Sequence, residues 1–598
     1  MQVTEYSVVP EPVYITQKAR SFPLTPKTRL CFVNLGQNTP TAKYISNSLR
    51  QMHIRPAFIG QPEKDCITIT LNDTTNPAIG REGYLLQVKP EGIFISANTE
   101  AGLFYAFQTF LQMVPANLHQ GTFRRIIMPE CTILDYPRFP WRGSHLDVCR
   151  HFFTIKEIKK HLDLMAAYKF NKFHFHLTDD QGWRIEIDQY PALNDIGSWR
   201  VDRSQYPWGC EPPARVGEEP TYGGYYTKKQ ITEIVEYAAQ RHIEVIPEIE
   251  LPGHCSPILA AYPEMSCSHK PHAVSLGPCS GEDANLCVGN PDVLTFICNV
   301  LDEVSELFPS EYIHIGGAAD PTTWQHCPRC LAAVNNNNLT NIADLQGWFI
   351  SQVEAHLTSK GKRIIGWGGL TDYSNLSSEA VVMTSRGDSS VAATAIRGNA
   401  VISVAPQYCN LSYYQTDSLY HPRAIPITTT LSQVYQFDPI PHGLTSDAQP
   451  FVWGGEAILW TDHILHYSQA EYFLLPRLCA LAECLWSQSE VKNWEHFRHK
   501  IEHQKELLSI NGYAGCKGSF KPIITLSRPV GEKNIEVTMT SEVEGTYIYY
   551  TLDGSNPTPE SNIYTTPFLV PKGTKIRTIS YYNGEAQEGI YEQVVITD

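Results

Sequence analysis

Short hydrophobic segments alternate with longer amphipathic segments along the middle of the chain, from Trp141 onward. Short apolar runs bounded by polar residues are typical of buried strands, and apolar residues repeated every three or four positions are typical of helices. The predicted strands are Gly143–Asp147, Lys172–Leu177, Glu244–Ile249, Tyr312–Gly316, Arg363–Trp367, Ala380–Thr384, Ala400–Val404 and Ala457–Trp460. The predicted helices include Ile155–Tyr168, Lys228–Arg241, Asp292–Leu307, Ile342–Lys360 and Gln469–Leu485. This alternation predicts a (β/α)8 TIM barrel over residues 137–510.

The segments on either side of the barrel have different patterns. Residues 1–136 combine β-like runs with a helical run at Gly102–Leu111, which predicts a small α+β domain. Its predicted strands are Arg29–Phe32, Ile67–Leu71, Tyr84–Val88 and Gly92–Ala97. Residues 520–598 show short alternating strands divided by turns at Asp553-Gly554 and Asn556-Pro557, which predicts a β-sandwich. The chain is therefore predicted to be a multidomain α/β protein.

The composition and net charge of the chain exclude some classes of protein. The 598 residues are 42% hydrophobic and 18% charged, as expected of a folded protein with several domains. A net charge of −15 argues against a nucleic-acid partner, which needs a basic surface. We expect no membrane span, because no apolar run reaches about 18 residues. Met1-Gln2 leads directly into polar sequence that is not typical of a signal peptide, so the chain is either cytoplasmic or an exported protein whose signal was removed.

The 16 cysteines fit no regular disulfide framework. Cys255, Cys267, Cys279 and Cys287 fall in one loop-like region and could be bridged. Cys327-Pro-Arg-Cys330 has metal-ligand spacing, but no clear second pair of Cys or His completes a zinc site. A structural or redox role is therefore favoured over zinc, and no metal or cofactor is expected.

Polar or tryptophan residues stand at the ends of several predicted strands. They are Asp147, Asp179, Glu248, His314, Trp367 and Trp460. Active sites of TIM barrels lie at the carboxyl ends of the strands, so these side chains are expected around one pocket. An acidic pair there would suit a glycosidase, which needs an acid and a nucleophile or its substitute. Taken singly, each residue has a structural alternative, and for His314 a buried, hydrogen-bonded imidazole is the favoured interpretation.

The segment His314–Trp324 has the frame of a catalytic strand end, with a hydrophobic run, a His, paired glycines and a Trp. Its centre, however, is Ala318-Ala319. Alanine has no proton to give and no charge to stabilise. Any functional hypothesis has to explain this pair.

Several long motifs follow one another in order along the barrel. They are Asp135–Gly143, Leu146–Phe152, Asn171–Trp183, Val245–His254, His314–Trp324 and Glu456–Asp462. On these motifs the chain resembles glycoside hydrolase family 20, the β-N-acetylhexosaminidases. The N-terminal domain looks like the family's usual companion, and Tyr549–Pro557 resembles the β-sandwich appended to many bacterial members. The resemblance implies an exo-acting enzyme that removes terminal N-acetylhexosamine from glycans, located in the periplasm or at the cell surface.

The resemblance also implies a mechanism. The family motif at the fourth strand is His-x-Gly-Gly-Asp-Glu, so Ala318 and Ala319 stand at the Asp and Glu positions. In the family the substrate's own acetamido oxygen attacks the anomeric carbon, and the Asp orients and stabilises it. The Glu protonates the leaving oxygen and later activates water.

Other roles are implied residue by residue. Arg150 should hold the 3- and 4-hydroxyls of the sugar with its planar donor fork. Asp179 and His254 should form the polar chain that tunes the acid. Trp367 and Trp460 should wall the acetamido pocket. Asp462 falls where the family usually has a Glu that reads sugar hydroxyls.

The chain departs from the family beyond the two alanines. Ser385 stands where a Trp usually precedes Arg-Gly, and Gly368-Gly369 follow Trp367 where Asp-Glu is common. Asn410 would replace a Tyr that holds the acetamido oxygen. Ser412 would replace an Asp that reads the 6-position. A neutral hydroxyl there would not repel a 6-sulfate, so a substrate carrying 6-sulfated N-acetylglucosamine is one hypothesis.

Three interpretations follow. The first is an active family enzyme whose Asp-Glu pair was deliberately replaced by Ala318-Ala319, so that the chain as written binds its sugar without cleaving it. The second is a natural pseudoenzyme that binds glycans, which the altered pocket favours. The third, a barrel with a non-carbohydrate function, is the weakest. The first two share a glycan partner and the same binding residues.

Overall fold

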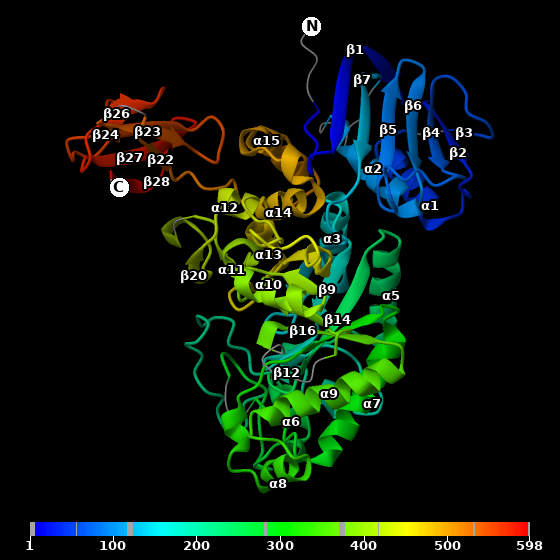
Figure 1. The fold of residues 1–598 in the computed structure, drawn as a ribbon, viewed down its shortest axis with the longest axis vertical. Coiled ribbons are helices and arrows are strands. Elements are labelled where there is room, and N and C mark those ends of the chain that lie inside the picture. Colours follow the sequence, from blue (N-terminus) through cyan, green and yellow to red (C-terminus); the bar gives the residue numbers. More distant parts are fainter. Residues whose placement is uncertain are drawn as a thin grey trace.

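A computed structural model describes residues 6–54, 57–115, 124–279, 284–369, 377–416, 418–529 and 533–595. The barrel forms the body of the molecule, and the N-terminal domain and the C-terminal sheets flank the same end of it (Figure 1). The long helix α15 (Trp494–Ile510) lies between these two flanking parts. The predicted fold class, with a central barrel, an N-terminal α+β domain and C-terminal sheets, is confirmed.

Eight parallel strands close the barrel in the order β14-β15-β16-β17-β18-β21-β8-β9. Their bounds are β8 Trp141–Asp147, β9 Lys172–His176, β14 Glu244–Leu251, β15 Tyr312–Gly316, β16 Arg363–Trp367, β17 Val381–Thr384, β18 Val401–Ser403 and β21 Val452–Ala457. Seven of these overlap their predicted ranges closely.

The predicted range of the last strand, Ala457–Trp460, was wrong, because the strand is Val452–Ala457 and shares only Ala457 with that range. The strand contains Gly454 and Gly455, whose lack of side chains interrupts the hydrophobic pattern. Gly454 has a φ of +141°, and a Cβ there would overlap the carbonyl oxygen of Trp141. The close approach of strands β21 and β8 therefore requires glycine at a position that looks like a turn in the sequence.

Some helices of the barrel begin with side-chain caps. Thr154 and Glu157 form a capping box at the start of α3, and Thr227 and Gln230 form another at α5. The main barrel helices are α3 Ile155–Ala167, α5 Lys228–Ala239, α7 Pro291–Leu307, α9 Asp344–Ser359, α10 Asp388–Arg397, α13 Tyr467–Leu474 and α14 Arg477–Trp486. The predicted helix Gln469–Leu485 is in fact two helices, because Pro476 lacks the N–H that would continue the first one.

The N-terminal domain is a seven-stranded sheet in the order β1-β7-β5-β6-β4-β2-β3, with helices α1 and α2. Its elements are β1 Tyr14–Leu24, β2 Arg29–Val33, α1 Pro40–Gln51, β3 Phe58–Ile59, β4 Cys66–Leu71, β5 Tyr84–Lys89, β6 Gly92–Ala97, α2 Glu100–Met113 and β7 Ile126–Asp135. The long strands β1 and β7 were not predicted. β1 is an edge strand in which only Phe22 and Leu24 are buried, and β7 contains Pro129.

Buried charges join this domain to the barrel. Lys169 Nζ lies 2.9 Å from Asp135 Oδ2, and both side chains are fully buried. The indole N–H of Trp486 donates to the same carboxylate at 3.0 Å. Because breaking a buried ion pair leaves an uncompensated charge, these contacts hold the two units in one arrangement.

The C-terminal part has two sheets, β22-β23-β26 and β25-β24-β27-β28. Their bounds are β22 Ile523–Ser527, β23 Ile535–Thr540, β24 Tyr547–Thr551, β25 Asn562–Ile563, β26 Phe568–Val570, β27 Lys575–Tyr582 and β28 Glu585–Val594. A separate small core fills this part, formed by Ile535, Val537, Met539, Ile548, Val570, Ile576 and Val595. Inward-facing apolar residues from both sheets are typical of a sandwich.

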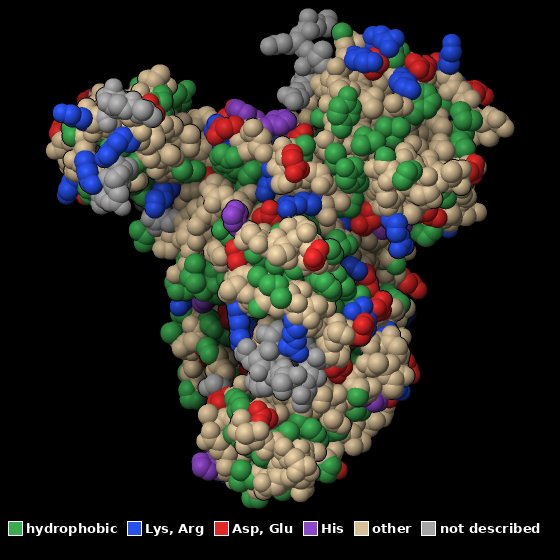
Figure 2. Space-filling model, viewed as in Figure 1, with side chains coloured by type: hydrophobic (Ala, Val, Ile, Leu, Met, Phe, Trp, Pro, Cys, Tyr) green, Lys and Arg blue, Asp and Glu red, His purple; other side chains and the backbone are tan. Residues whose placement is uncertain are grey.

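The described helices include none that is both long and apolar enough to cross a membrane. On the face in Figure 2, Lys and Arg side chains are intermixed with Asp and Glu side chains.

Candidate active site

A cavity of about 480 Å³ opens at the carboxyl ends of the barrel strands. Its lining residues are Arg150, Asp179, Glu250, His254, Gly317, Ala318, Ala319, Gln346, Trp367, Gly368, Gly369, Ser385, Arg386, Val404, Pro406, Asn410, Ile458 and Trp460. Of the ten residues predicted for the site, eight therefore line one cavity. Ser412 and Asp462 do not line it.

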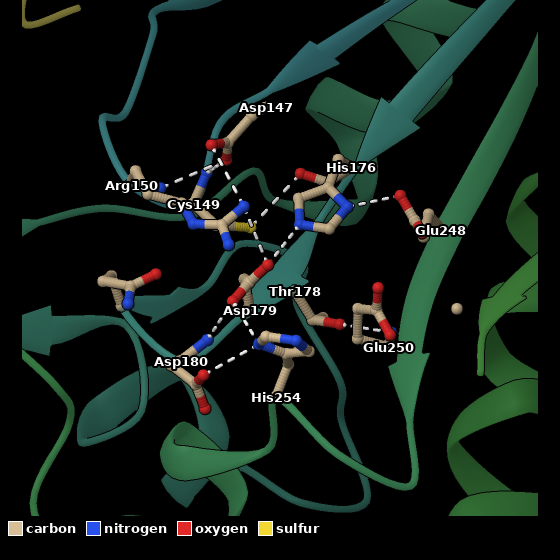
Figure 3. A network of polar contacts seen from close by, with 12 residues as sticks. Asp147, Cys149, Arg150, His176, Thr178, Asp179, Asp180, Glu248, Glu250 and His254 are labelled. Carbon is tan, nitrogen blue, oxygen red and sulfur yellow. Dashed lines mark hydrogen bonds and ion pairs between the residues drawn. The ribbon is translucent and has the colours of Figure 1, made fainter. Parts of the chain in front are cut away.

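Asp179 connects three cationic side chains on one side of the cavity (Figure 3). Its Oδ2 lies 2.8 Å from Arg150 Nη1 and 2.8 Å from His176 Nε2, and its Oδ1 lies 3.2 Å from His254 Nδ1. Burial alone would raise the pKa of Asp179, but Arg150 and His254 hold it well below its usual value. The carboxylate is therefore ionised and fixes the direction of all three side chains.

His254 follows strand β14 in a left-handed conformation, with a φ of +53°. Its Nδ1 also lies 2.8 Å from Asp180 Oδ2, and Asp180 accepts a hydrogen bond from the Ser256 hydroxyl. Asp179 raises the pKa of His254 well above its usual value despite the cost of burial. His254 is accordingly an imidazolium at neutral pH and presents positive charge to the cavity.

Arg150 is held in place by two carboxylates and one ring. Besides Asp179, its Nη1 donates to Asp147 Oδ2 at 3.3 Å, and its guanidinium carbon lies 4.9 Å from the centroid of the Trp460 ring. The Thr461 N–H donates to Asp147 at 3.0 Å, which fixes that carboxylate. A guanidinium fixed in this way presents its planar donor fork to the cavity with little freedom left to lose.

Glu248 and Glu250 alternate on strand β14, so both side chains point into the barrel. Glu248 contacts His176 and His314, and the indole N–H of Trp367 donates to its Oε1 at 2.8 Å. Burial would raise the pKa of Glu248, but the histidines hold it well below its usual value.

Glu250 has the opposite character. Burial, reinforced by the charge of Glu248, raises the pKa of Glu250 to about 8, so this carboxyl is mostly protonated at neutral pH. Gly316 has a φ of +65°, and a Cβ there would overlap Glu250 Oε2. Glu250 was not singled out from the sequence, although its alternation with Glu248 was a usable signal.

Beneath the cavity floor lies a buried histidine cluster. His314 is fully buried, its Nδ1 lies 2.9 Å from Glu248 Oε1, and burial lowers its pKa to about 4. His174 is also fully buried. Burial lowers the pKa of His174, but Glu248 and Glu456 outweigh that effect and raise it to about 9. His314 therefore has the buried, bonded position that its structural interpretation predicts.

Ala318 and Ala319 line the cavity just after strand β15, which is the neighbour of β14 in the barrel. The carbonyl of Ala318 accepts a hydrogen bond from the Gly253 N–H at 2.8 Å, which ties this segment to the one that carries His254. The side chains of both alanines are methyl groups, so neither has a polar atom to offer a ligand.

Two indoles form the cavity wall. The rings of Trp367 and Trp460 have centroids 5.9 Å apart and are tilted by 47°. Ser412 is buried behind this wall, where its hydroxyl accepts a hydrogen bond from the backbone N–H of Trp460 at 2.6 Å. The side-chain oxygen of Asn410 accepts the backbone N–H of Ser412 at 3.0 Å. Asp462 lies close enough to Arg150 for that charge to lower its pKa, although burial raises it overall.

The cysteines are arranged differently from the prediction. All 16 lie within the described residues and none forms a disulfide, so the suggested bridging among Cys255, Cys267, Cys279 and Cys287 was wrong. Instead, Cys267 and Cys287 gather with Cys327 and Cys330. The expectation that no second cysteine pair accompanies Cys327 and Cys330 was therefore also wrong. Cys267 and Cys287 are that pair, and they are 20 positions apart in the sequence, which is not a recognisable metal-ligand spacing.

An aromatic-walled cavity at the carboxyl ends of the strands, with a fixed arginine and buried carboxylates, is typical of sugar-binding hydrolases of the TIM-barrel class. A model of the "Glycosyl hydrolase family 20, catalytic domain" matches residues 139–489, and one of "Glycosyl hydrolase family 20, domain 2" matches residues 5–136. A "Chitobiase/beta-hexosaminidase C-terminal domain" matches residues 530–592. The chain belongs to glycosyl hydrolase family 20, the β-hexosaminidases.

Relatives and solved structures agree with this assignment. A beta-hexosaminidase of Porphyromonas gingivalis is 34% identical over 97% of this chain and 74% of its own length. The exo beta-N-acetylglucosaminidase of Vibrio harveyi, solved with N-acetylglucosamine, is 28% identical with a TM-score of 0.75, covering 86% of this chain and 78% of that one. The Vibrio harveyi protein was also solved as an inactive Asp-to-Ala mutant, with the same identity, coverage and TM-score.

Proposed function

We propose that this chain has the fold and binding site of an exo-acting β-N-acetylhexosaminidase and that, as written, it binds a terminal N-acetylhexosamine without hydrolysing it. The observation that carries this proposal is the asymmetry of one cavity. Arg150, Asp179 and His254 form a complete charged network there, whereas Ala318 and Ala319 supply only methyl groups.

The binding steps use residues that are present. The Arg150 fork would hold two sugar hydroxyls, because Asp147 and Asp179 already fix its direction. Trp367 and Trp460 would enclose the acetamido group. Burying a sugar between indole faces gains hydrophobic contact while the hydroxyls stay hydrogen-bonded.

The chemical step needs two groups that are missing. At position 318 an Asp would orient the acetamido oxygen for attack on the anomeric carbon and stabilise the positive charge that develops. At position 319 a Glu would protonate the leaving oxygen and then activate water. Ala318 and Ala319 have no lone pair or proton for either step.

The direct test uses the unaltered chain and an aryl N-acetyl-β-glucosaminide. Calorimetry is expected to show binding, and no aryl alcohol should be released. An aryl β-glucoside without the acetamido group serves as the matched control and should bind at least about tenfold more weakly, since it lacks one hydrogen-bonding group. Equal binding of the two compounds, or no binding of either, would contradict the proposal.

The sugar that we propose is N-acetylglucosamine, with a preference for its 6-sulfated form. Support comes from Arg386, which lines the cavity, and from the neutral Ser412, which is buried behind the cavity wall at a position where an Asp is expected. A carboxylate near the 6-position would repel the sulfate, whereas a hydroxyl does not. In a chain with Ala318→Asp and Ala319→Glu, kcat/KM on the 6-sulfated aryl substrate should exceed that on the unsulfated one, and Ser412→Asp should reverse the order. An equal or lower value on the sulfated substrate would exclude this choice.

The alternative is a natural glycan-binding pseudoenzyme on the same fold. The altered pocket favours it, because Ser385 and Gly368-Gly369 also depart from the family pattern. The gene decides between the two: codons for Asp and Glu at positions 318 and 319 exclude the pseudoenzyme. We also propose export to the periplasm or cell surface, where glycans are accessible, which cell fractionation would test.

A further inference from the structure

We propose that Cys267, Cys287, Cys327 and Cys330 bind one zinc ion as a tetrahedral thiolate site. Their four sulfur atoms all lie within 4.8 Å of one another, and three of the four residues are buried. This cluster lies outside the sugar cavity, and none of its members lines that cavity.

The sulfur distances match a zinc site. Cys287 Sγ lies 3.6 Å from Cys327 Sγ and 3.7 Å from Cys330 Sγ, and Cys267 Sγ lies 3.9 Å from Cys330 Sγ. A tetrahedral zinc ion with Zn–S bonds of about 2.3 Å separates its sulfur ligands by about 3.8 Å. A disulfide would require about 2.05 Å. The four thiols therefore already stand at ligand spacing rather than at bonding distance.

The backbone around the cluster holds this spacing. Cys327 is the N-cap of α8 (Pro328–Asn336), and Cys330 lies in its first turn, where the helix dipole favours thiolates. The Cys287 N–H donates to the Met265 carbonyl at 2.8 Å, which brings the Cys267 and Cys287 segments together.

Glycine is required at the contact between the two cysteine pairs. A Cβ at Gly289 would lie 2.5 Å from the Cys330 Cα. Only glycine allows the backbone after Cys287 to approach the Cys327–Cys330 turn this closely. On the other side, Arg329 Nη2 donates to the Ser266 carbonyl at 2.9 Å, beside Cys267.

The ligand types select the metal class. Four sulfur donors with no carboxylate or imidazole among them favour zinc, or iron, over magnesium and calcium. The Cys-x-x-Cys turn with a distant second pair is the arrangement of closed structural zinc sites, which leave no open position for a substrate. The site would therefore stabilise structure rather than take part in hydrolysis.

The proposed zinc joins the two segments that border the sugar cavity. Cys267 and Cys287 belong to the segment that follows His254, and Cys327 and Cys330 to the one that follows Ala318-Ala319. The same two segments are joined by the Asn285 amide, which donates to the Asp320 carbonyl at 2.7 Å, and by the Trp324 indole N–H, which donates to the Leu286 carbonyl at 2.9 Å. A metal here would fix His254 against the segment that carries positions 318 and 319.

The test measures metal in the unaltered full-length chain. After expression in zinc-supplemented medium and purification without chelator, elemental analysis should give about one zinc per chain. Replacement of zinc by cobalt should produce the absorption bands of a tetrahedral thiolate cobalt site. Removal of the metal with a chelator should lower Tm, and added zinc should restore it.

Variants locate the site. Cys327→Ser with Cys330→Ser should lose the zinc, whereas Cys298→Ser, which changes a half-buried cysteine on α7 outside the cluster, should keep it. Folded protein with less than about one tenth of a zinc per chain would overturn the proposal. So would stoichiometric iron in place of zinc, or peptide mapping that finds disulfides among these four cysteines. The zinc content of the unaltered chain decides the proposal, so the test holds even if a variant fails to fold.

Discussion

The two sides of the sugar cavity are built from the same kind of strand end but differ in chemistry. On the side of β9 and β14, Asp179 contacts Arg150, His176 and His254 within 3.2 Å. On the side of β15, Ala318 and Ala319 contribute only methyl groups to the cavity surface. The charged network does not need the β15 side to hold its geometry, because each of its charges has a partner within the network.

Under the proposed function, this difference separates sugar binding from the chemical step in this barrel. A group that orients a sugar has to be present in the resting state, and its position is fixed by neighbours such as Asp147. A group that transfers a proton can be removed without leaving a buried charge unpaired, provided that its partners are satisfied elsewhere.

Removing the charge of Asp179, which contacts Arg150 and His254, should abolish sugar binding. Asp179→Asn leaves Arg150 and the imidazolium of His254 without their shared carboxylate, so we expect a stability loss of about 3–5 kcal/mol and a loss of sugar affinity. Chemical denaturation and calorimetry measure the two effects. Asp302→Asn, which removes a partly exposed partner of His356 and Lys360, is the matched control and should change either quantity little. A variant of unchanged stability that still binds the sugar would refute the importance of the network.

The raised pKa of Glu250, in contrast to the lowered pKa of Glu248, should make the stability of the protein depend on pH. Its folded pKa of about 8 lies above its unfolded value, so between these values the native state binds one proton more than the unfolded state. Unfolding free energy therefore falls as pH rises from about 5 to 8, by at most about 1.4 kcal/mol per pH unit from this group.

Glu250→Gln removes this dependence. Its stability relative to the unaltered chain should rise steadily between pH 5 and pH 8, as measured by urea denaturation at several pH values. A difference between the two proteins that stays constant with pH would mean that Glu250 titrates normally.

A smaller effect is expected behind the cavity wall. Ser412→Ala removes the hydroxyl that accepts the backbone N–H of Trp460. This should cost about 1–3 kcal/mol of stability, because a buried donor loses its partner. Ser412→Thr keeps the hydroxyl and is expected to stay within about 1 kcal/mol of the unaltered chain. Thermal unfolding of the three proteins measures the ranking, and equal losses for Ala and Thr would show that packing rather than the hydrogen bond matters.

The sequence predicts the barrel well because its strands and helices have strong local patterns. The hydrophobic pattern mispredicts an element where the residue type is required by a contact with a distant part of the sequence. Gly454 reads as a turn but lies in a strand, since its neighbour Trp141 is more than 300 positions away. Pro476 divides one apolar segment into two helices.

The candidate site divides in the same way. Asp179, His254 and Arg150 stand in motifs that follow strand ends, so the sequence was sufficient to group them around one cavity. The protonation of Glu250 depends on burial beside Glu248. The meeting of Cys267 and Cys287 with Cys327 and Cys330, at the start of α8, depends on contacts between segments that are far apart in the sequence. Neither depends on local periodicity, so neither was visible before the fold was known.

The most direct test of the central claim is to restore the missing chemistry. Ala318→Asp with Ala319→Glu should raise the rate of aryl N-acetyl-β-glucosaminide hydrolysis by at least about 10⁴-fold over the unaltered chain, since a general acid and an oriented charge each contribute about 10²-fold or more. The anomeric configuration of the released sugar should be retained. A folded double variant that binds the sugar as tightly as the unaltered chain but releases no aryl alcohol would contradict the account.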